Sequence, residues 1–191
     1  MTNFAIIDTE TNWNDVVMSI GAVIADADTY QPLYSKYYII TPEHRVGGMF
    51  SHALFLEDEM LNYECSRKKA LSDLMTCFES NGVTDIFAYN ASFDYRHLPE
   101  LSDFCWYDIM KLAAYRQFNP KIPSYSNCHG TGRLKSGYGV EPILRLLSGD
   151  VTYCEQHNAL TDALDELKIM VLLEHGFDSY VKIKKRKHVH E

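Results

Sequence analysis

Four acidic residues and one histidine stand where strands and helices are expected to end or begin: Asp8, Glu10, Asp94, His157 and Asp162. Residues 4–7 are apolar and predict a buried strand that runs directly into Asp8 and Glu10. Successive side chains alternate across a strand, so two acids that lie two positions apart project from the same face. An Asp-x-Glu pair alone is common by chance, and its meaning depends on the other three residues.

Asp162 lies early in a long helix that the periodicity predicts from about residue 158 to 175. At about 100° per residue, Asp162 shares one face with Ile169 and Leu173, whereas Asp165 falls on the polar side. We expect a separate apolar stripe formed by Leu160, Leu164, Leu167 and Val171. An acid that points into the protein is costly without a partner, and metal coordination can compensate for that cost.

Carboxylates that converge from separate elements predict a site for hard divalent cations such as Mg²⁺ or Mn²⁺. Three or four such groups can hold two ions, which is the arrangement used for in-line displacement at phosphorus. A neutral histidine can accept a proton from the attacking water at physiological pH. His157, just before the predicted helix, is the candidate for this role.

Three sequence motifs carry a resemblance to a known family. Residues 6–11 (IIDTET), 90–94 (NASFD) and 157–163 (HNALTDA) resemble, in order, the three exonuclease motifs of the DEDDh 3′–5′ exonucleases, the superfamily of proofreading exonucleases and ribonuclease T. The resemblance implies an α/β, ribonuclease H-like fold with a mixed five-stranded sheet flanked by helices. It also implies that Asp8, Glu10, Asp94 and Asp162 are metal ligands, that His157 is the general base, and that two Mg²⁺ or Mn²⁺ ions are the cofactors.

The activity implied is release of nucleoside 5′-monophosphates from the 3′ end of a single strand. We expect five residues near the motifs to bind this substrate: Thr9, Thr11, Trp13, Asn90 and Phe93. The chain departs from the family where a Thr-Gly pair is common, because residues 11–14 read Thr-Asn-Trp-Asn. Trp13 can stack on the terminal base or simply pack on the fold, and the same alternative applies to Phe93.

The elements that must position these residues follow from the hydrophobic pattern. Residues 4–7, 16–25 and 33–40 predict three strands in an antiparallel meander, and 85–89 and 104–108 predict two more. Helices are predicted over 64–80, from 109 to 115, and over 140–147 and 158–175. Strands that alternate with helices imply parallel pairing in the second half of the sheet. Residues 119–139 form a long polar loop, which is often functional at this length.

The chain of 191 residues has the length of one domain and a net charge of −8. We assign residues 1–178 to an exonuclease domain and 179–191 to a basic tail. The five cysteines form no C-x-x-C pair, and no apolar run or basic leader predicts a membrane span or signal peptide. We therefore expect a cytoplasm-like compartment with reduced thiols.

Several alternatives remain open at this stage. A noncatalytic nucleic-acid-binding or polymerase-binding subunit can share the fold, and a third interpretation treats the acids as unrelated surface charges. DNA and RNA are not distinguished, and a homodimer or a polymerase or other protein partner is neither predicted nor excluded. Lys121, Arg133 and Lys135 in the long loop, together with the basic tail, are further candidates for contacts to phosphates.

Overall fold

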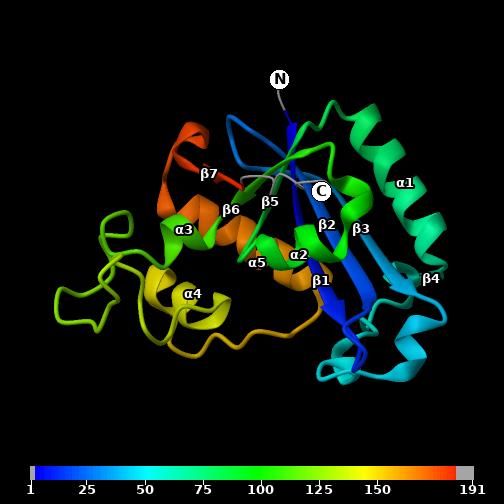
Figure 1. Cartoon of the computed structure of the whole chain (residues 1–191), viewed down its shortest axis with the longest axis horizontal. Coiled ribbons are helices and arrows are strands. Elements are labelled where there is room, and N and C mark those ends of the chain that lie inside the picture. Colours follow the sequence, from blue (N-terminus) through cyan, green and yellow to red (C-terminus); the bar gives the residue numbers. More distant parts are fainter. Residues whose placement is uncertain (1–2, 184–191) are drawn as a thin grey trace, which may run out of the picture.

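A single mixed sheet organises the protein in the computed structural model, which describes residues 3–183 (Figure 1). Its strand order is β4-β3-β2-β1-β5-β6-β7. Strands β1 (Asn3–Thr11), β2 (Val17–Asp26) and β3 (Pro32–Ile40) form the predicted antiparallel meander. β5 (Asp85–Ala88) pairs parallel with β1, and β6 (Cys105–Asp108) pairs parallel with β5. The ribonuclease H-like architecture expected from the sequence is confirmed.

The sheet has two more strands than the five predicted. β4 (Tyr63–Cys65) pairs parallel with β3, and β7 (Val181–Lys182) pairs antiparallel with β6. Strands of two or three residues carry no readable alternation, so the sequence pattern does not reveal them. β7 also brings residues assigned to the basic tail into the sheet, and residues 184–191 of that tail lie outside the described part of the chain.

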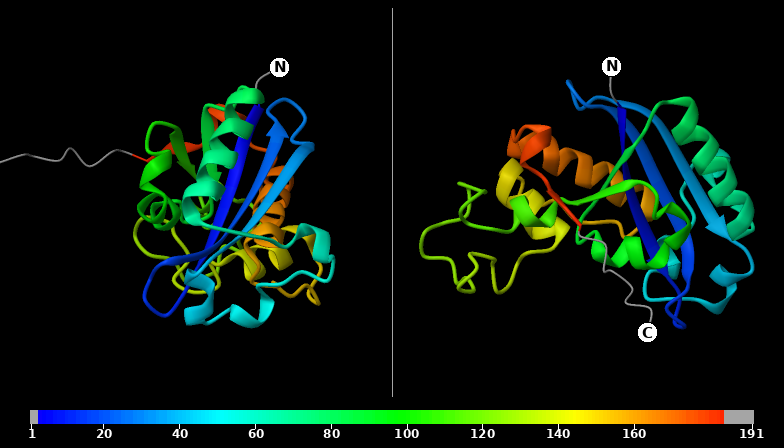
Figure 2. Two further views of the ribbon diagram at one scale, coloured as in Figure 1. Left: turned by 90° about the vertical axis from the view of Figure 1, so that its right-hand side faces the viewer. Right: turned by 45° about the horizontal axis from the view of Figure 1, so that its top comes forward.

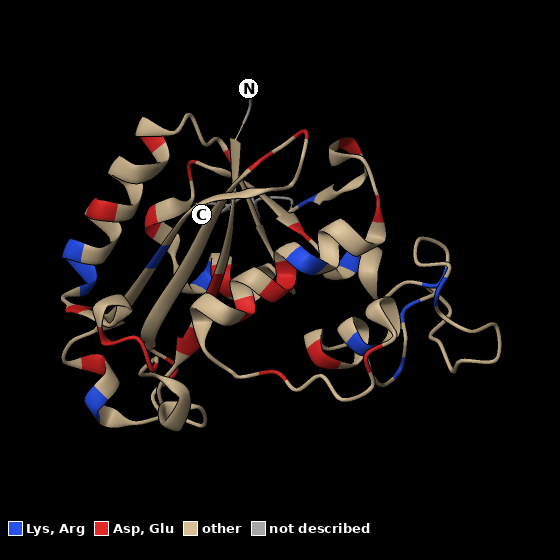
Figure 3. Ribbon diagram, turned by 180° about the vertical axis from the view of Figure 1, so that it is seen from behind, with Lys and Arg blue, Asp and Glu red and all other residues tan. Residues whose placement is uncertain are grey.

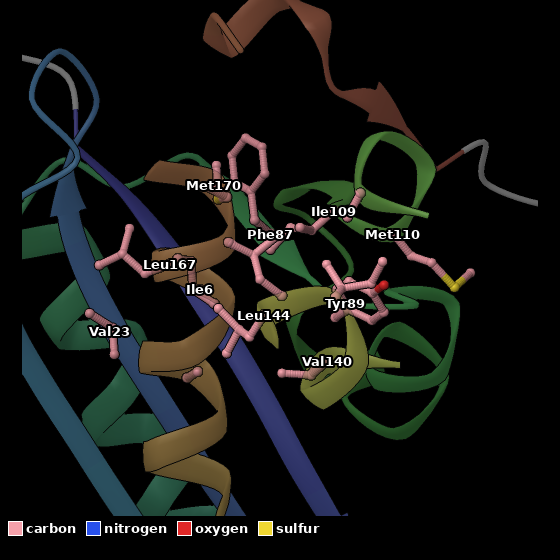
Figure 4. Packing of buried hydrophobic residues seen from close by; sticks show 14 of the residues in the cluster. Ile6, Val23, Phe87, Tyr89, Ile109, Met110, Val140, Leu144, Leu167 and Met170 are labelled. Atoms are coloured by element: carbon pink, nitrogen blue, oxygen red, sulfur yellow. The ribbon is translucent and has the colours of Figure 1, made fainter. Parts of the chain in front are cut away.

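Helices cover both faces of the sheet (Figure 2). α3 (Met110–Ala113), α4 (Val140–Ser148) and α5 (Ala159–Leu173) pack on one face, and α1 (Arg67–Ser80) and α2 (Ser92–His97) on the other. The alternation of β1 serves both cores, because Phe4 and Ile6 enter the α5 side while Ala5 and Ile7 enter the α1 side. Figure 4 shows the α5-side core between Ile6, Phe87 and Leu167.

Short 3₁₀ helices occupy the connections. They span Glu43–Val46, Ser51–Ala53, Glu59–Leu61, Pro99–Leu101 and Phe177–Ser179. The long loop predicted over 119–139 contains no helix or named strand, and it begins earlier than predicted because α3 ends at Ala113 rather than at residue 115. Two isolated bridges cross the loop. Among residues 3–183, no helix is long and apolar enough to cross a membrane.

Two helix predictions need correction. α1 begins at Arg67 rather than at residue 64, because Glu64 and Cys65 belong to β4 and Ser66 caps the helix by accepting from the Lys69 N–H. In α5, Leu164 and Val171 are 40% and 46% exposed while Leu160 and Leu167 are buried, so only part of the predicted apolar stripe faces the core.

The buried arc of α5 is centred on Ala159, Ala163, Glu166 and Met170, at intervals of three and four residues. The two alanines allow the helix to lie close to the sheet. Asp165 is not a freely solvated acid, because the Tyr153 hydroxyl donates to it. Asp162 points inward as predicted and is 4% exposed.

Gly21 sets the distance between α5 and the sheet. It pairs with Asp8 across the β1–β2 ladder, and a Cβ built on it would lie 2.1 Å from the Ala159 carbonyl oxygen. Real Cβ atoms do not approach backbone oxygens this closely, so only glycine permits the observed packing. The first turn of α5, which carries Asp162, therefore sits directly against the strands beside Asp8.

Candidate active site

The predicted acids meet at the carboxyl ends of two neighbouring parallel strands. Asp8 and Glu10 lie near the C-terminal end of β1, and Asp94 lies in α2, shortly after β5. β1 pairs parallel with β5, so the two chain segments leave the sheet side by side. The carboxyl ends of parallel strands are the usual place for ligand binding in α/β folds. α5 brings Asp162 to the same point from the opposite face of the sheet.

The start of α5 is fixed by Asn158. Its side-chain oxygen accepts from the Leu160 N–H at 3.0 Å, while its amide donates to the Tyr37 hydroxyl at 2.9 Å and to the Ala53 carbonyl at 2.8 Å. An N-cap that is also hydrogen-bonded to β3 and to the 51–53 helix fixes the helix in position as well as starting it. His157, which precedes Asn158, and Asp162, in the first turn of α5, are therefore held in position relative to the sheet.

A cleft of about 430 Å³ joins these elements. Its lining includes all ten residues that the sequence assigned to catalysis, metal binding or substrate binding, together with five others: Asp8, Thr9, Glu10, Thr11, Asn12, Trp13, Met49, Phe50, Tyr89, Asn90, Phe93, Asp94, Glu155, His157 and Asp162. The interpretation of the acids as unrelated surface charges required them to lie far apart, and this arrangement contradicts it.

The carboxylates share one electrostatic environment. Burial and the charge of Asp162 raise the pKa of Glu10 to about 8, and burial and the nearby Glu155 raise the pKa of Asp162 to about 8. Burial raises the pKa of Asp94 to about 7 although the hydrogen bond from Thr9 opposes the shift. The pKa of Asp8 is well above its ordinary value because of burial and then the charges of Asp94 and Asp162. Without a cation, these groups repel one another.

The site has unused acceptor capacity that fits a cation. Asp8 Oδ2 and Asp162 Oδ1 are buried and have no hydrogen-bond partner among the described residues. Glu10, His157 and Asp162 each offer one ligand atom, and these atoms lie within 4.8 Å of one another. Buried charged oxygens are normally paired or bound to metal. Oxygen donors of this kind suit Mg²⁺ or Mn²⁺.

His157 is held in an uncommon conformation beside the acids. Its backbone has φ of 55°, in the left-handed region that residues other than glycine seldom occupy. Its ring stacks on Phe50 with the centroids 4.0 Å apart and an angle of 18° between the planes. The turn and the stacking together direct the imidazole into the cleft near Glu10 and Asp162.

Among the predicted substrate contacts, Trp13 is the most accessible, with 67% of its surface exposed. Asn12 stabilises the turn that carries Trp13. Its buried side chain accepts from the N–H groups of Asn14 and Val16 and donates to the Glu43 carbonyl. The departure from the Thr-Gly pattern is thus an asparagine-stabilised turn with an aromatic side chain at its tip. Trp13 is therefore not part of the buried core, and its stacking on a terminal base stays a prediction.

The other four predicted contacts differ in accessibility. Asn90 is exposed at the turn after β5, with φ of 60°, while Phe93 and Thr11 are partly buried at the cleft wall. The Arg96 guanidinium lies over the Phe93 ring, 5.6 Å from its centroid. Thr9 is 4% exposed, and its hydroxyl donates to Asp94 Oδ1 at 2.7 Å. We therefore interpret the Thr9 side chain as one that orients Asp94.

Several site residues were missed by the sequence interpretation. Met49 and Phe50 form an apolar wall contributed by the 43–53 connection, and no local pattern in the sequence places that connection near the acids. Glu155 and Tyr89 also line the cleft. Glu166, four residues after Asp162, is 1% exposed, and its pKa is raised by burial and by the charges of Asp8 and Asp94. Its spacing of one helical turn from Asp162 was a signal that could have identified it.

Comparison with known proteins gives structural matches only. No family model matches the sequence, and no curated protein matches it. The nuclease domain of 3′hExo, a DEDDh family member solved with bound rAMP, has a TM-score of 0.66 at 15% identity, with 96% of this chain and 97% of that chain covered. The chain therefore shares the fold of this nuclease domain.

Two further solved structures share this fold. A 3′-exonuclease described in 3′-end recognition of the histone mRNA stem-loop has a TM-score of 0.62 at 14% identity, with 96% of this chain and 91% of that chain covered. The zinc-bound E. coli ExoI–ssDNA complex has a TM-score of 0.60 at 12% identity. That match covers 91% of this chain but 40% of the ExoI chain.

Proposed function

We propose that this protein is a metal-dependent 3′–5′ exonuclease that releases nucleoside 5′-monophosphates from single-stranded nucleic acid. The observation that carries the proposal is the convergence of Asp8, Glu10, Asp94 and Asp162 on one cleft, with His157 beside them. Buried oxygens of Asp8 and Asp162 without hydrogen-bond partners support a role in holding cations. The structures with the same fold, described as 3′-exonucleases or as complexes with single-stranded DNA, are consistent with this chemistry.

Asp8, Glu10, Asp94 and Asp162 would hold two Mg²⁺ or Mn²⁺ ions. Bound there, the ions would supply positive charge that acidifies the attacking water and stabilises the leaving oxygen. His157 accepts the proton of that water at its imidazole. The water oxygen bonds to phosphorus, and the bond from phosphorus to the 3′ oxygen of the preceding nucleotide breaks. The products are a nucleoside 5′-monophosphate and a strand that is one nucleotide shorter.

The walls of the cleft would position the terminal nucleotide. Trp13 presents an exposed indole, and Met49 and Phe93 line the same cleft, so a terminal base can stack on an aromatic face. Asn90 at its exposed turn is the candidate for a contact to the sugar–phosphate backbone. Stacking accepts any base, and a splayed single-stranded end suits such a cleft better than a paired one.

The main alternative is a noncatalytic subunit that binds nucleic acid or a polymerase through the same fold. A subunit of that kind has no need for the complete acid cluster and its histidine, yet all five positions are retained here. No specific observation favours the alternative, and the exonuclease remains the stronger proposal.

The test is digestion of matched 5′-labelled DNA and RNA oligonucleotides, single-stranded and duplex, with Mg²⁺ or Mn²⁺. We expect a ladder that shortens from the 3′ end of single strands and disappears with EDTA. Asp162→Asn should abolish the ladder, whereas Asp28→Asn, at an exposed turn after β2, should leave it intact. Equal cleavage by Asp162→Asn and the unmodified protein would disprove the metal-site assignment. Comparison of the DNA and RNA arms identifies the substrate.

A further inference from the structure

The stretch between Asp108 and Glu141 has a charge unlike the rest of the chain. Residues 109–140, named here the acid-free segment, contain five Lys and Arg residues and no Asp or Glu. All 26 acidic residues lie elsewhere in a chain whose net charge is −8. Figure 3 shows the segment with basic positions in blue and none in red. A local positive charge on an acidic protein is a feature that attracts polyanions.

The acid-free segment is held in shape by its own contacts. Arg116 donates its backbone N–H to the Gly132 carbonyl at 3.0 Å, and Leu134 donates to the Ala114 carbonyl at 2.9 Å. The Arg116 guanidinium donates to the Ser126 carbonyl and, at 3.1 Å, to Cys128 Sγ. Asn119 is fully buried and donates to the Ala113 carbonyl at 2.7 Å. Arg116 is therefore used inside the segment, which forms a preorganised surface.

Three other cations of the segment remain available to solvent. Lys121 and Lys135 are exposed, and Arg133 is partly exposed. None of the ion pairs formed within residues 3–183 involves any of the three. A cation without an acidic partner can contact a phosphate without first breaking an ion pair.

A continuous path connects these cations to the active-site cleft. Tyr89, which lines the cleft, donates its hydroxyl to the carbonyl of Tyr138. The Arg133 guanidinium lies 5.1 Å from the ring centroid of Tyr138, whose side chain is 39% exposed. Figure 4 shows Tyr89 next to Val140, the first residue of α4 and the last of the segment. The backbone of Tyr138 thus contacts a residue of the cleft lining, its ring carries the Arg133 guanidinium, and Lys135 lies two residues after Arg133 in the chain.

We infer that the acid-free segment binds the single strand on the 5′ side of the nucleotide held in the cleft. Arg133, Lys135 and Lys121 contact successive phosphates, and Tyr138 stacks on a base as the strand leaves the cleft. The inference rests on the proposed function, because that function places the 3′ end among the carboxylates. The chemistry recognised is a flexible polyanion with unpaired bases, and a duplex does not offer such bases for stacking.

The test compares Arg133→Gln/Lys135→Gln with the matched control Lys68→Gln/Lys69→Gln, which removes two exposed cations from α1, on the far side of the sheet from α5. Binding of a 5′-fluorescein-labelled single strand of about twenty nucleotides is measured by anisotropy in EDTA over a range of salt. We expect the segment variant to bind about tenfold more weakly at low salt. Its slope of log affinity against log salt should be smaller by about 1.4, since each single-strand phosphate contact contributes about 0.7.

A second measurement separates this inference from the proposed function. With Mg²⁺, the ratio of kcat/KM for the oligonucleotide to kcat/KM for a dinucleotide, which has no upstream strand, should fall about tenfold in the segment variant. The control variant should keep the unmodified ratio. Unchanged affinity and salt slope in the segment variant, or an equal loss in the control, would overturn the inference. Segment-dependent binding without hydrolysis of either substrate would instead overturn the exonuclease proposal.

Discussion

The cleft and the acid-free segment are adjacent surfaces with opposite charges. In the cleft, acids from β1, α2 and α5 lie close together, and burial followed by the charges of neighbouring acids raises the pKa values of Asp8, Glu10 and Asp162. In the segment, cations project from a loop that contains no acid. The net charge of −8 conceals this division. The comparison teaches how an acidic protein could bind nucleic acid under the proposed function: divalent cations would neutralise the acids at the reacting phosphate, while the acid-free segment would attract the rest of the strand.

The largest effect should come from Asp8→Asn, which keeps the side-chain shape but removes a charge from the acid cluster. Loss of a ligand that stabilises transition-state charge should lower kcat by about 10⁴-fold. Binding of a single strand in EDTA should be unchanged or tighter, because a negative charge near the phosphate is lost. Labelled-oligonucleotide digestion and anisotropy measure the two outcomes. Retained turnover would remove Asp8 from the metal site, and weaker binding in EDTA would contradict the division of charge between the two surfaces.

His157→Ala should lower kcat by about 10²–10⁴-fold, the usual effect of losing a general base. The acid cluster remains, so cation binding, measured by Mg²⁺-induced thermal stabilisation, should persist. His52→Ala is the control, since His52 is exposed in the 51–53 helix outside the cleft lining. A variant that loses both turnover and Mg²⁺ stabilisation would assign His157 to the metal site instead, and unchanged turnover would exclude it from proton transfer.

Stability without metal should fall as the pH rises. Folding raises the pKa of Asp94 to about 7 and the pKa values of Glu10 and Asp162 to about 8, so between about pH 4 and pH 8 the folded state binds more protons than the unfolded state. Stability therefore decreases through this window. Mg²⁺ at about 100 times its Kd should restore about 2.7 kcal/mol at pH 8, a rise of several degrees in Tm. Melting curves between about pH 5 and pH 8, recorded with EDTA or with Mg²⁺, measure this dependence. Stability that rises with pH in EDTA would show that the acids are stabilised by another partner.

Trp13→Ala should have the smallest effect and should separate stacking from charge. Loss of one stacked base costs about 1–3 kcal/mol, so the Kd for a single strand should rise by about 5- to 150-fold, with the lower end expected for so exposed a side chain. The salt slope should not change, because no cation is removed. Trp13→Phe should retain most of the affinity. A changed salt slope in Trp13→Ala would show that the two surfaces are not independent.

Much of the fold was readable because its elements follow simple periodicities. The meander, the two parallel strands and the last long helix appear at the predicted places, and the motifs fall at their ends. What failed was short or lacked a pattern. β4 and β7 are too brief to show alternation, and the 43–53 connection that supplies Phe50 has no helical or strand period.

Helix orientation was predicted correctly for Asp162 but not for its neighbours. A helical wheel groups residues by angle, and it placed the exposed Leu164 and Val171 in one apolar stripe with the buried Leu160 and Leu167. The close contact between Gly21 and Ala159 helps to determine which arc of α5 faces the sheet. That arc contains Glu166, whose spacing from Asp162 was a signal in the sequence but whose burial depends on this packing.

The sequence by itself determined the residue types of the site and the elements that carry them, because strand and helix periods are local properties of the chain. It also determined the absence of acids between residues 109 and 140. Only the tertiary structure decided that Phe50 stacks on His157, that Thr9 holds Asp94, and that Tyr138 joins the acid-free segment to the cleft. These contacts connect residues distant in the chain, and packing of the whole sheet sets their distances.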